Sequence, residues 1–197
     1  MTLLSTLFRQ RLLGPELHKS RIDILGVYVS VISQDGLNDA IVESVKCCEK
    51  KVIAYINLNA INIARGNEQF REFLNCAAIA YCDGEGVRLG AKILGRELPP
   101  RIVLTYWIWQ LCALCEQNGL RVFFLGGSHE AVTRAVRNVK ERFPRLTVAG
   151  SYHGFFQKSG PESDIVVEMI NEVKPNILFV CFGMPIQEFW IKENFSR

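Results

Sequence analysis

Several apolar segments of this chain end in polar or glycine-rich residues, and Asp83 is the acid among them. Residues 79–88 read Ile-Ala-Tyr-Cys-Asp-Gly-Glu-Gly-Val-Arg, which predicts a buried strand that ends on Asp83 before a helix begins. A carboxylate there lies at the edge where open α/β sheets bind their ligands. It can act as a general base that takes a proton from a hydroxyl group. An Asp before a helix is also a common N-cap, so this stretch alone leaves both interpretations open.

Amides and glycines follow the other segments that we expect to be strands. These residues are Asn57, Asn59, Gly126, Gly127, Gly183 and Gln187. Because the carboxyl ends of parallel strands meet at one edge of a sheet, we expect all of them to collect with Asp83 on one rim of one sheet. Glycine lets a ligand approach the backbone closely, and amide side chains both donate and accept hydrogen bonds. The predicted rim therefore carries one acid among neutral polar groups.

Arg101 follows a turn at Pro99 and Pro100 and adds a positive charge to this set. The set suits a reaction in which a hydroxyl group loses a proton and a phosphate group leaves. Asp83 would take the proton, while Arg101 and helix N-termini would stabilise the charge on a leaving diphosphate. The sequence has no Asp-x-Asp pair that would hold a divalent metal on that diphosphate, so we expect protein donors to do this work, with no metal and no cofactor.

Strand-like segments alternate along the chain with segments of helical periodicity. Strands are expected over 51–56, 79–82, 121–125, 146–149 and 176–181, with one or two more within 22–32. This alternation predicts an α/β fold, Rossmann-like, with a mostly parallel sheet and helices on both faces. Gly84 and Gly86 start a dinucleotide-binding pattern, but Leu89 occupies its third glycine position. We therefore do not expect a dinucleotide-dependent oxidoreductase.

The composition is that of an ordinary soluble protein. Of the 197 residues, 49% are hydrophobic and 22% are charged, and the net charge of +3 is too small to indicate a nucleic-acid partner. The seven cysteines fall mostly inside apolar segments and no secretory signal is visible, which favours a reduced, cytoplasmic chain. The most apolar segment, 102–115, is shorter than the ~20 residues that a membrane-spanning helix needs.

Two segments combine basic residues with an apolar face. Residues 2–13 place leucines at helical spacing with Arg9 and Arg11 between them. This pattern fits an amphipathic helix on an anionic membrane surface, or a frayed terminus. Five basic side chains between 134 and 145 fit a solvated helix face or one that approaches anionic lipid.

The order of the motifs carries a resemblance to a known family. Asn-Ala follows one expected strand, and Asp-Gly-x-Gly-Val follows the next. An Arg comes after a proline turn, and Gly-Gly follows a third strand. The last two motifs are His-Gly-Phe-Phe over 153–156 and Gly-Met-Pro-x-Gln-Glu-x-Trp over 183–190. From Ile22 to Arg197 the chain resembles the WecG/TagA/CpsF family of glycosyltransferases. The resemblance implies an inverting hexosyltransferase that moves a sugar such as N-acetylmannosamine from a UDP-sugar donor to a polyprenyl-diphosphate-linked sugar. Such enzymes build cell-surface polysaccharides such as teichoic acids or exopolysaccharides.

The resemblance also assigns roles to residues. Asp83 matches the family's general base, Arg101 an arginine near phosphate or sugar, and the Gly126-Gly127 turn a place where a ligand approaches backbone amides. The full substrate-binding set that we infer is Asn57, Asn59, Arg101, Gly126, Gly127, His153 and Gln187. Without the resemblance, His153 fits a turn histidine better than a catalytic one, and Gln187 could simply fill the first turn of a helix.

The chain departs from the family pattern at three places. Asn57 stands where the family usually has Thr, and Tyr106 stands where it usually has an acid, so donor specificity is expected to differ. Family members continue beyond the position of Arg197 with a basic, aromatic segment. We therefore expect a basic amphipathic extension over 1–21 and a glycosyltransferase core over 22–197 that is truncated at its C-terminus. The alternative is a nucleotide-sugar-binding core that is inactive without that segment.

The resemblance finally implies where the protein works. Its acceptor is carried by a lipid, so we expect a peripheral protein at the inner face of the cell membrane, with the cytoplasmic membrane surface as a partner. Family members form dimers or trimers. The apolar helix expected after Arg101 fits either such a homo-oligomer contact or a buried core helix.

Overall fold

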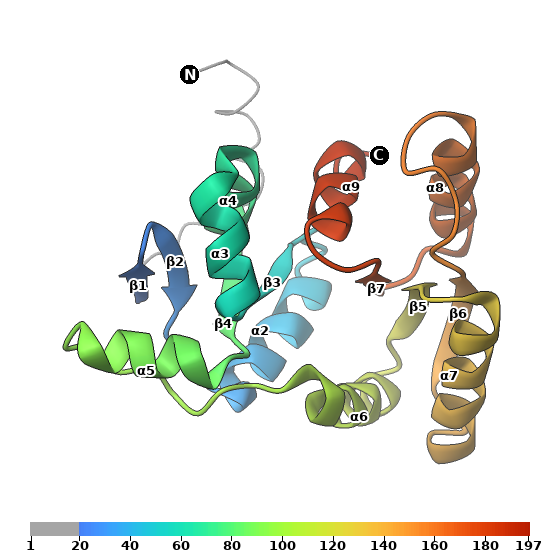
Figure 1. The fold of residues 1–197 in the computed structure, drawn as a ribbon. Helices are drawn as coiled ribbons and strands as arrows, with labels where there is room; N and C mark the ends of the chain where they lie inside the picture. Colours follow the sequence, from blue (N-terminus) through green and yellow to red (C-terminus); the bar gives the residue numbers. More distant parts are fainter. Residues whose placement is uncertain (1–19) are drawn as a thin grey trace. The chain divides into compact units, whose positions relative to one another are not determined.

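A computed structural model describes residues 20–197, so the amphipathic segment expected over 2–13 lies outside the described part. The core that we expected over 22–197 forms two compact units, which divide between Leu104 and Thr105. Figure 1 labels the helices and strands of both units.

The first unit contains a β-hairpin, a parallel pair of strands and the helices between them. Its elements are β1 (Arg21–Ile24), β2 (Val27–Ser30), α2 (Gln34–Lys46), β3 (Ile53–Ile56), α3 (Leu58–Gly66), α4 (Glu68–Cys76), β4 (Ile79–Cys82) and α5 (Glu85–Ile93). Strands β1 and β2 pair antiparallel, and β3 and β4 pair parallel. Strand β4 is buried along its whole length, as expected for the continuous apolar run of a parallel strand that is covered on both faces.

Arg21 attaches the hairpin to the rest of the first unit. Its guanidinium donates hydrogen bonds to the carbonyl oxygens of Asn75, Ala77 and Ala78, at distances of 2.7 to 3.1 Å. These carbonyls lie at the end of α4, where a helix leaves carbonyl groups without partners of its own. Arg21, which we had placed in the N-terminal extension, therefore belongs to β1 and to the folded unit.

The second unit is built around three parallel strands. Its elements are α6 (Leu104–Gln117), which begins at the boundary, β5 (Arg121–Gly126), α7 (His129–Arg142), β6 (Thr147–Tyr152), α8 (Pro161–Val173), β7 (Ile177–Cys181) and α9 (Ile186–Asn194). The strand order is β6-β5-β7, and both pairings are parallel.

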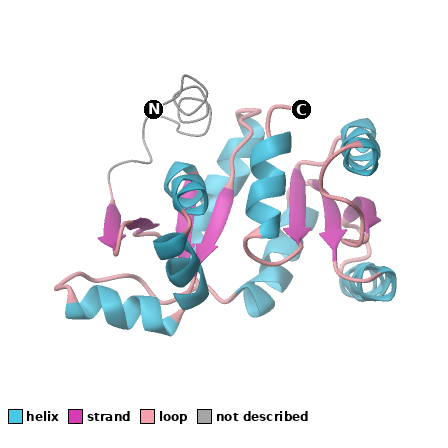
Figure 2. Cartoon of the chain, turned by 45° about the horizontal axis from the view of Figure 1, so that its top comes forward, coloured by secondary structure: helices cyan, strands magenta, loops and turns pink. Residues whose placement is uncertain are grey.

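Helices cover both faces of the three-stranded sheet. Phe123 and Leu125 of β5 share a buried cluster with residues of α8 and with Trp190 of α9. Because successive side chains of a strand point to opposite faces, Phe124 points away from that cluster, and its ring stacks on Phe179 of β7 at 5.1 Å. Helix α7 packs against β5 and β6, and Figure 2 shows a helix on either side of the sheet.

The predicted α/β fold, Rossmann-like with parallel strands and flanking helices, is confirmed. The strands of the described residues form a hairpin, a two-stranded parallel sheet and a three-stranded parallel sheet. At one edge of β4, the N–H of Ala80 donates to the hydroxyl of Ser30, and the carbonyl of Cys82 accepts from the N–H of Ile102. These bonds tie β4 to other parts of the first unit.

Among the helices of residues 20–197, none has the length and apolar character to cross a membrane.

Candidate active site

The ends of β3 and β4 hold Asn57 and Asp83 next to each other. The N–H of Asp83 donates to the carbonyl of Ile56 at 2.9 Å, which continues the β3–β4 ladder to the last strand residues. A Cβ atom added to Gly84 would lie only 3.1 Å from the Cα of Asn57. Glycine at this position therefore permits the close approach of the two turns. This part of the predicted rim is formed as expected.

Asn57 begins helix α3. Its side-chain oxygen accepts a hydrogen bond from the N–H of Ala60 at 3.0 Å, so it is the N-cap of the helix. Asn59 lies in the first turn of the same helix and is exposed. The two asparagines thus stand on one helix start beside Asp83, where one caps the helix and the other faces solvent.

Asp83 is not the N-cap of α5, although its position before that helix left this interpretation open. The N-cap is Gly84, with no side-chain hydrogen bond. The half-buried carboxylate of Asp83 instead accepts a hydrogen bond from the N–H of Leu104 and lies near Arg101. Burial raises the pKa of Asp83 above its ordinary value, while the Leu104 hydrogen bond and the charge of Arg101 oppose that rise.

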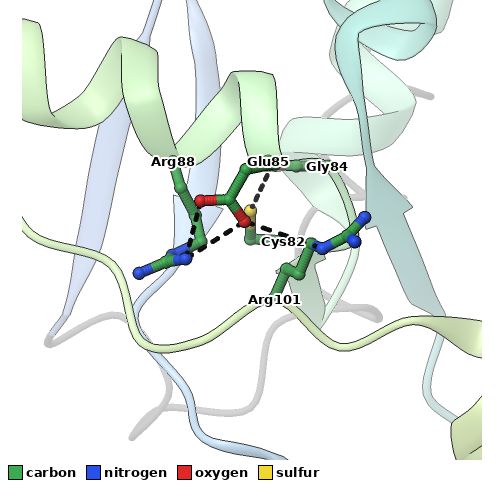
Figure 3. A network of polar contacts seen from close by, with 5 residues as sticks. All are labelled: Cys82, Gly84, Glu85, Arg88 and Arg101. Atoms are coloured by element: carbon green, nitrogen blue, oxygen red, sulfur yellow. Dashed lines mark hydrogen bonds and ion pairs between the residues drawn. The ribbon is translucent and has the colours of Figure 1, made fainter.

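Glu85 contacts two arginines, Arg88 and Arg101, as Figure 3 shows. Its carboxylate accepts from Arg88 Nη1 at 2.8 and 3.1 Å, and Oε2 lies 3.6 Å from Nε of Arg101. Arg101 is half exposed and so can also reach a ligand. The sequence analysis did not include Glu85 or Arg88 in the site. Their spacing of three residues on a helix was the available signal, because such pairs commonly meet.

In the second unit, the Gly126-Gly127 turn ends β5 and contacts the end of the neighbouring strand β7. Gly126 has a φ of +138°, and a Cβ atom there would lie 2.2 Å from the carbonyl oxygen of Cys181. Gly127 has a φ of +68°, and its carbonyl accepts from the N–H of Gly154 at 2.8 Å. Ser128 then caps α7 through the N–H of Ala131. The turn has the glycine geometry that the sequence predicted.

A pocket of about 600 Å³ opens beside this turn, at the carboxyl ends of the strands of the second unit. Gly127, Phe156, Lys158 and Phe182 are among the residues that line it. Lys158 Nζ donates to the carbonyls of Gly154 and Phe156 at 2.6 and 2.7 Å, and it lies 4.0 and 4.5 Å from the ring centroids of Phe156 and Phe182. Burial lowers the pKa of Lys158. The sequence analysis missed Lys158.

His153 and Gln187 lie in the same unit but do not line that pocket. His153 Nδ1 accepts from the N–H of Phe155 at 3.2 Å, and its ring stacks on Tyr152 at 4.3 Å, which is the behaviour of a turn histidine. Buried Gln187 accepts from the N–H of Gly183 at 3.1 Å and donates to Glu188 at 2.9 Å. Gln187 therefore holds the Gly-Met-Pro turn before α9.

Glu188 is a buried acid that the sequence analysis did not assign to the site. Its side chain is 4% exposed, one carboxylate oxygen accepts from Gln187, and the other has no hydrogen-bond partner among residues 20–197. Burial raises the pKa of Glu188. Gly183 is thus linked through Gln187 to the carboxyl group of Glu188. The sequence did not indicate that this glutamate is buried, because it lies in an unbroken helical pattern.

The predicted site residues fall into two groups. Asn57, Asn59, Asp83 and Arg101 belong to the first unit, and Gly126, Gly127, His153 and Gln187 belong to the second. The first group offers a base beside a cation, and the second offers a pocket with a cation and aromatic rings. Within residues 20–197 we find no cluster of His, Cys, Asp and Glu side chains that could hold a metal ion.

Comparisons with known proteins agree with these motifs. A family profile described as glycosyl transferase WecG/TagA/CpsF family matches residues 22–197. The chain is 30% identical over 139 residues to an N-acetylglucosaminyldiphosphoundecaprenol N-acetyl-beta-D-mannosaminyltransferase of Staphylococcus aureus, with 71% of this chain and 53% of the relative covered. It is also 30% identical over 128 residues to a protein of the same name from Bacillus spizizenii, with 65% and 48% covered. The match thus spans about half the length of these relatives.

Proposed function

The chain belongs to the WecG/TagA/CpsF family of glycosyl transferases, and we propose that it moves a sugar from a UDP-linked donor to a polyprenyl-diphosphate-linked sugar, with inversion. The relatives' names state transfer of N-acetylmannosamine to an acceptor of this class. The sugar donor, the acceptor and the stereochemistry are our proposals for this chain. Its product would be an intermediate of a cell-surface polysaccharide.

The observation that carries the proposal is the environment of Asp83. A general base needs a carboxylate that can take a proton at the moment of attack, and partial burial raises the pKa of Asp83 in that direction. In the proposed step, a hydroxyl oxygen of the acceptor attacks the anomeric carbon of the donor sugar while Asp83 accepts the hydroxyl proton. The bond from the anomeric carbon to the diphosphate breaks, and UDP leaves. A single displacement of this kind inverts the anomeric centre.

Arg101 is proposed to bind phosphate on a substrate. It already faces the carboxylate of Glu85 at 3.6 Å, and its side chain is 47% exposed. A guanidinium that is held at one side by a carboxylate and open at the other is well placed to form charge-assisted hydrogen bonds with a phosphate oxygen. Asn57 and Asn59, at the adjacent helix start, are proposed to bind substrate hydroxyl groups.

The pocket of the second unit is proposed to bind the UDP part of the donor. Its aromatic walls suit a flat base, Lys158 supplies a positive charge, and Gly127 lines the pocket without a side chain that would fill it. We assign His153 and Gln187 a supporting role beside this pocket, because the side chain of each accepts a hydrogen bond from the backbone of a neighbouring turn.

We further propose that the protein works as a peripheral protein at the inner face of the cell membrane, where a polyprenyl-linked acceptor would be embedded. Association of several copies of the chain is proposed from the family resemblance alone. Neither proposal depends on the assignment of Asp83.

The test measures UDP release from a panel of UDP-sugars, with and without a polyprenyl-diphosphate-N-acetylglucosamine acceptor. We expect acceptor-dependent release, and a loss of about 10²- to 10⁴-fold in kcat for Asp83→Asn, because a positioned base contributes a factor of that size. Asp39→Asn, an exposed acid on α2, serves as the matched control and should retain full activity. Calorimetric titration should show unchanged UDP-sugar affinity in both variants.

Undiminished release by Asp83→Asn would contradict the assignment of the base. Binding of UDP-sugar without release under any acceptor condition would instead favour the alternative, a nucleotide-sugar-binding core without turnover.

A further inference from the structure

Helix α5 presents apolar side chains on its outer face as well as on its inner face. Val87 and Ala91 are buried in the first unit, whereas Leu89 and Ile93 are 59% and 77% exposed. At 100° per residue, these two lie opposite the buried pair. A surface helix of a soluble protein normally carries polar residues there. Burial among the described residues therefore does not explain the apolar side chains on the outer face of α5.

A further apolar side chain extends this face. Leu58, 56% exposed, lies directly over Gly86, where an added Cβ would be 2.5 Å from its Cδ1 atom. Gly86 and Ile93 are seven residues apart, so they share one side of the helix. We call the set Leu58, Leu89 and Ile93 the α5 apolar surface.

Positive charge accompanies the α5 apolar surface. Lys92 and Arg96 are both exposed and stand within three residues of Ile93. Between residues 85 and 101 the chain carries four basic and two acidic side chains, and one of the acids, Glu85, is engaged with Arg88. An apolar strip with lysine and arginine beside it is the pattern of a helix that lies in the interface of an anionic membrane.

We propose that the α5 apolar surface docks this protein on an anionic lipid bilayer, with Leu89 and Ile93 at the boundary of headgroups and acyl chains and with Lys92 and Arg96 on lipid phosphates. The inference rests on the proposed function, in which the acceptor is a membrane lipid. Asp83 stands two residues before α5, so the proposed base lies next to the N-terminal end of the helix that carries this surface.

The test is sedimentation of the full chain with vesicles of phosphatidylcholine alone or mixed with phosphatidylglycerol. We expect binding to the anionic vesicles, and a loss of about tenfold in the partition coefficient for the double variant Leu89→Gln, Ile93→Gln. Ile165→Gln, an equally exposed apolar residue on α8, is the matched control and should bind like the unaltered chain. All three side chains are exposed and are replaced by glutamine, a good helix former, so folding should be preserved.

A charge test distinguishes this surface from the basic face of α7. Lys92→Glu with Arg96→Glu should weaken binding to anionic vesicles about tenfold, whereas Arg134→Glu with Lys140→Glu should change it little. Equal binding by the α5 variants and the unaltered chain would overturn the proposal. So would a change in oligomeric state, measured by analytical ultracentrifugation, with vesicle binding intact, because the surface would then contact a second copy.

The outcome is separable from that of the transferase proposal. With a short-chain, water-soluble acceptor, the α5 variants should release UDP at the rate of the unaltered chain, since Leu89 and Ile93 have no role in the chemical step. Normal turnover with soluble acceptor and undiminished vesicle binding would reject the docking surface alone. Loss of turnover in Asp83→Asn tests the chemistry irrespective of membranes.

Discussion

The N–H of Leu104 donates a hydrogen bond to the carboxylate of Asp83, yet the pKa of that carboxylate is raised, because burial outweighs the hydrogen bond and the charge of Arg101. The raised pKa of Asp83 determines how the rate should change with pH if Asp83 is the general base. The base works only when ionised, so kcat/KM should fall as pH drops through a pKa above the ordinary value for Asp. A pH profile of kcat/KM for UDP release measures this acidic limb.

Arg101→Gln should move that acidic limb to higher pH. Arg101 lowers the pKa of Asp83, so its removal lets the pKa rise further and protonates the base over a wider range of pH. The experiment compares pH profiles of kcat/KM for UDP release. Arg88→Gln is the matched control, because it removes an arginine of the same network that does not shift Asp83. An acidic limb that stays in place in Arg101→Gln would show that another group controls the profile.

Gly126→Ala should destabilise the second unit strongly. The new methyl group would lie 2.2 Å from the carbonyl oxygen of Cys181, a backbone atom that cannot turn away, and φ is +138°. We expect a loss of about 3 kcal/mol or more in the free energy of unfolding, from strain and overpacking together. Urea denaturation followed by circular dichroism measures this loss.

Gly127→Ala is the control for Gly126. Its φ of +68° is also left-handed, but an added Cβ would meet only the Ala131 methyl group, at 3.4 Å. The expected loss is therefore about 1 kcal/mol, the cost of the conformation alone. Equal losses at the two glycines would mean that the contact with Cys181 is relieved by a movement of the backbone.

The features that could be predicted from sequence are those set by neighbouring residues. The glycine turn after β5 and the N-cap at Ser128 follow from local turn and helix-capping preferences, and both are present. The adjacency of Asn57 and Asp83 follows from parallel pairing of two short apolar strands. In each case the residue types that make the structure are close together in the chain or repeat with a simple period.

The features that could not be predicted depend on residues that are distant in sequence. Nothing near Ala80 indicates that its N–H bonds to Ser30, fifty residues earlier. Lys158 lies in a polar loop, and its contact with the ring of Phe182 requires the end of β7 to be in place. Glu188 has the helical spacing of a surface residue, and its burial is visible only once α9 packs.

Glu188→Gln should remove a pH dependence from stability. Burial raises the pKa of Glu188 in the folded state, so the folded chain holds its proton to a higher pH than the unfolded chain does. Stability from this group is therefore greatest at acidic pH and falls as pH rises through the raised pKa. The glutamine cannot ionise, so its stability relative to the unaltered chain should increase from acidic to neutral pH. Urea midpoints at a series of pH values measure this difference.

Gln187→Ala should lower the free energy of unfolding more than Glu188→Gln does. It removes the hydrogen bonds that Gln187 makes with the N–H of Gly183 and with the carboxylate of Glu188 in a buried setting. An unsatisfied buried group costs about 1–3 kcal/mol. If Glu188→Gln lost more stability than Gln187→Ala at every pH, the charge of Glu188 would have to be stabilised by contacts other than Gln187.

Lys158→Met should weaken binding of UDP about tenfold while leaving the fold intact, because methionine keeps much of the apolar length against Phe156 and Phe182 but has no charge. Burial lowers the pKa of Lys158, so the ammonium loses its charge at a lower pH than an ordinary lysine does. The affinity of the unaltered chain for UDP should accordingly decline as the solution becomes alkaline, and the methionine variant should lack this decline. Calorimetric titration at several pH values, with Lys140→Met on the exposed face of α7 as control, separates the pocket charge from the general charge of the protein. If Lys158→Met and Lys140→Met bound UDP equally well at all pH values, the pocket of the second unit would not be where the diphosphate binds.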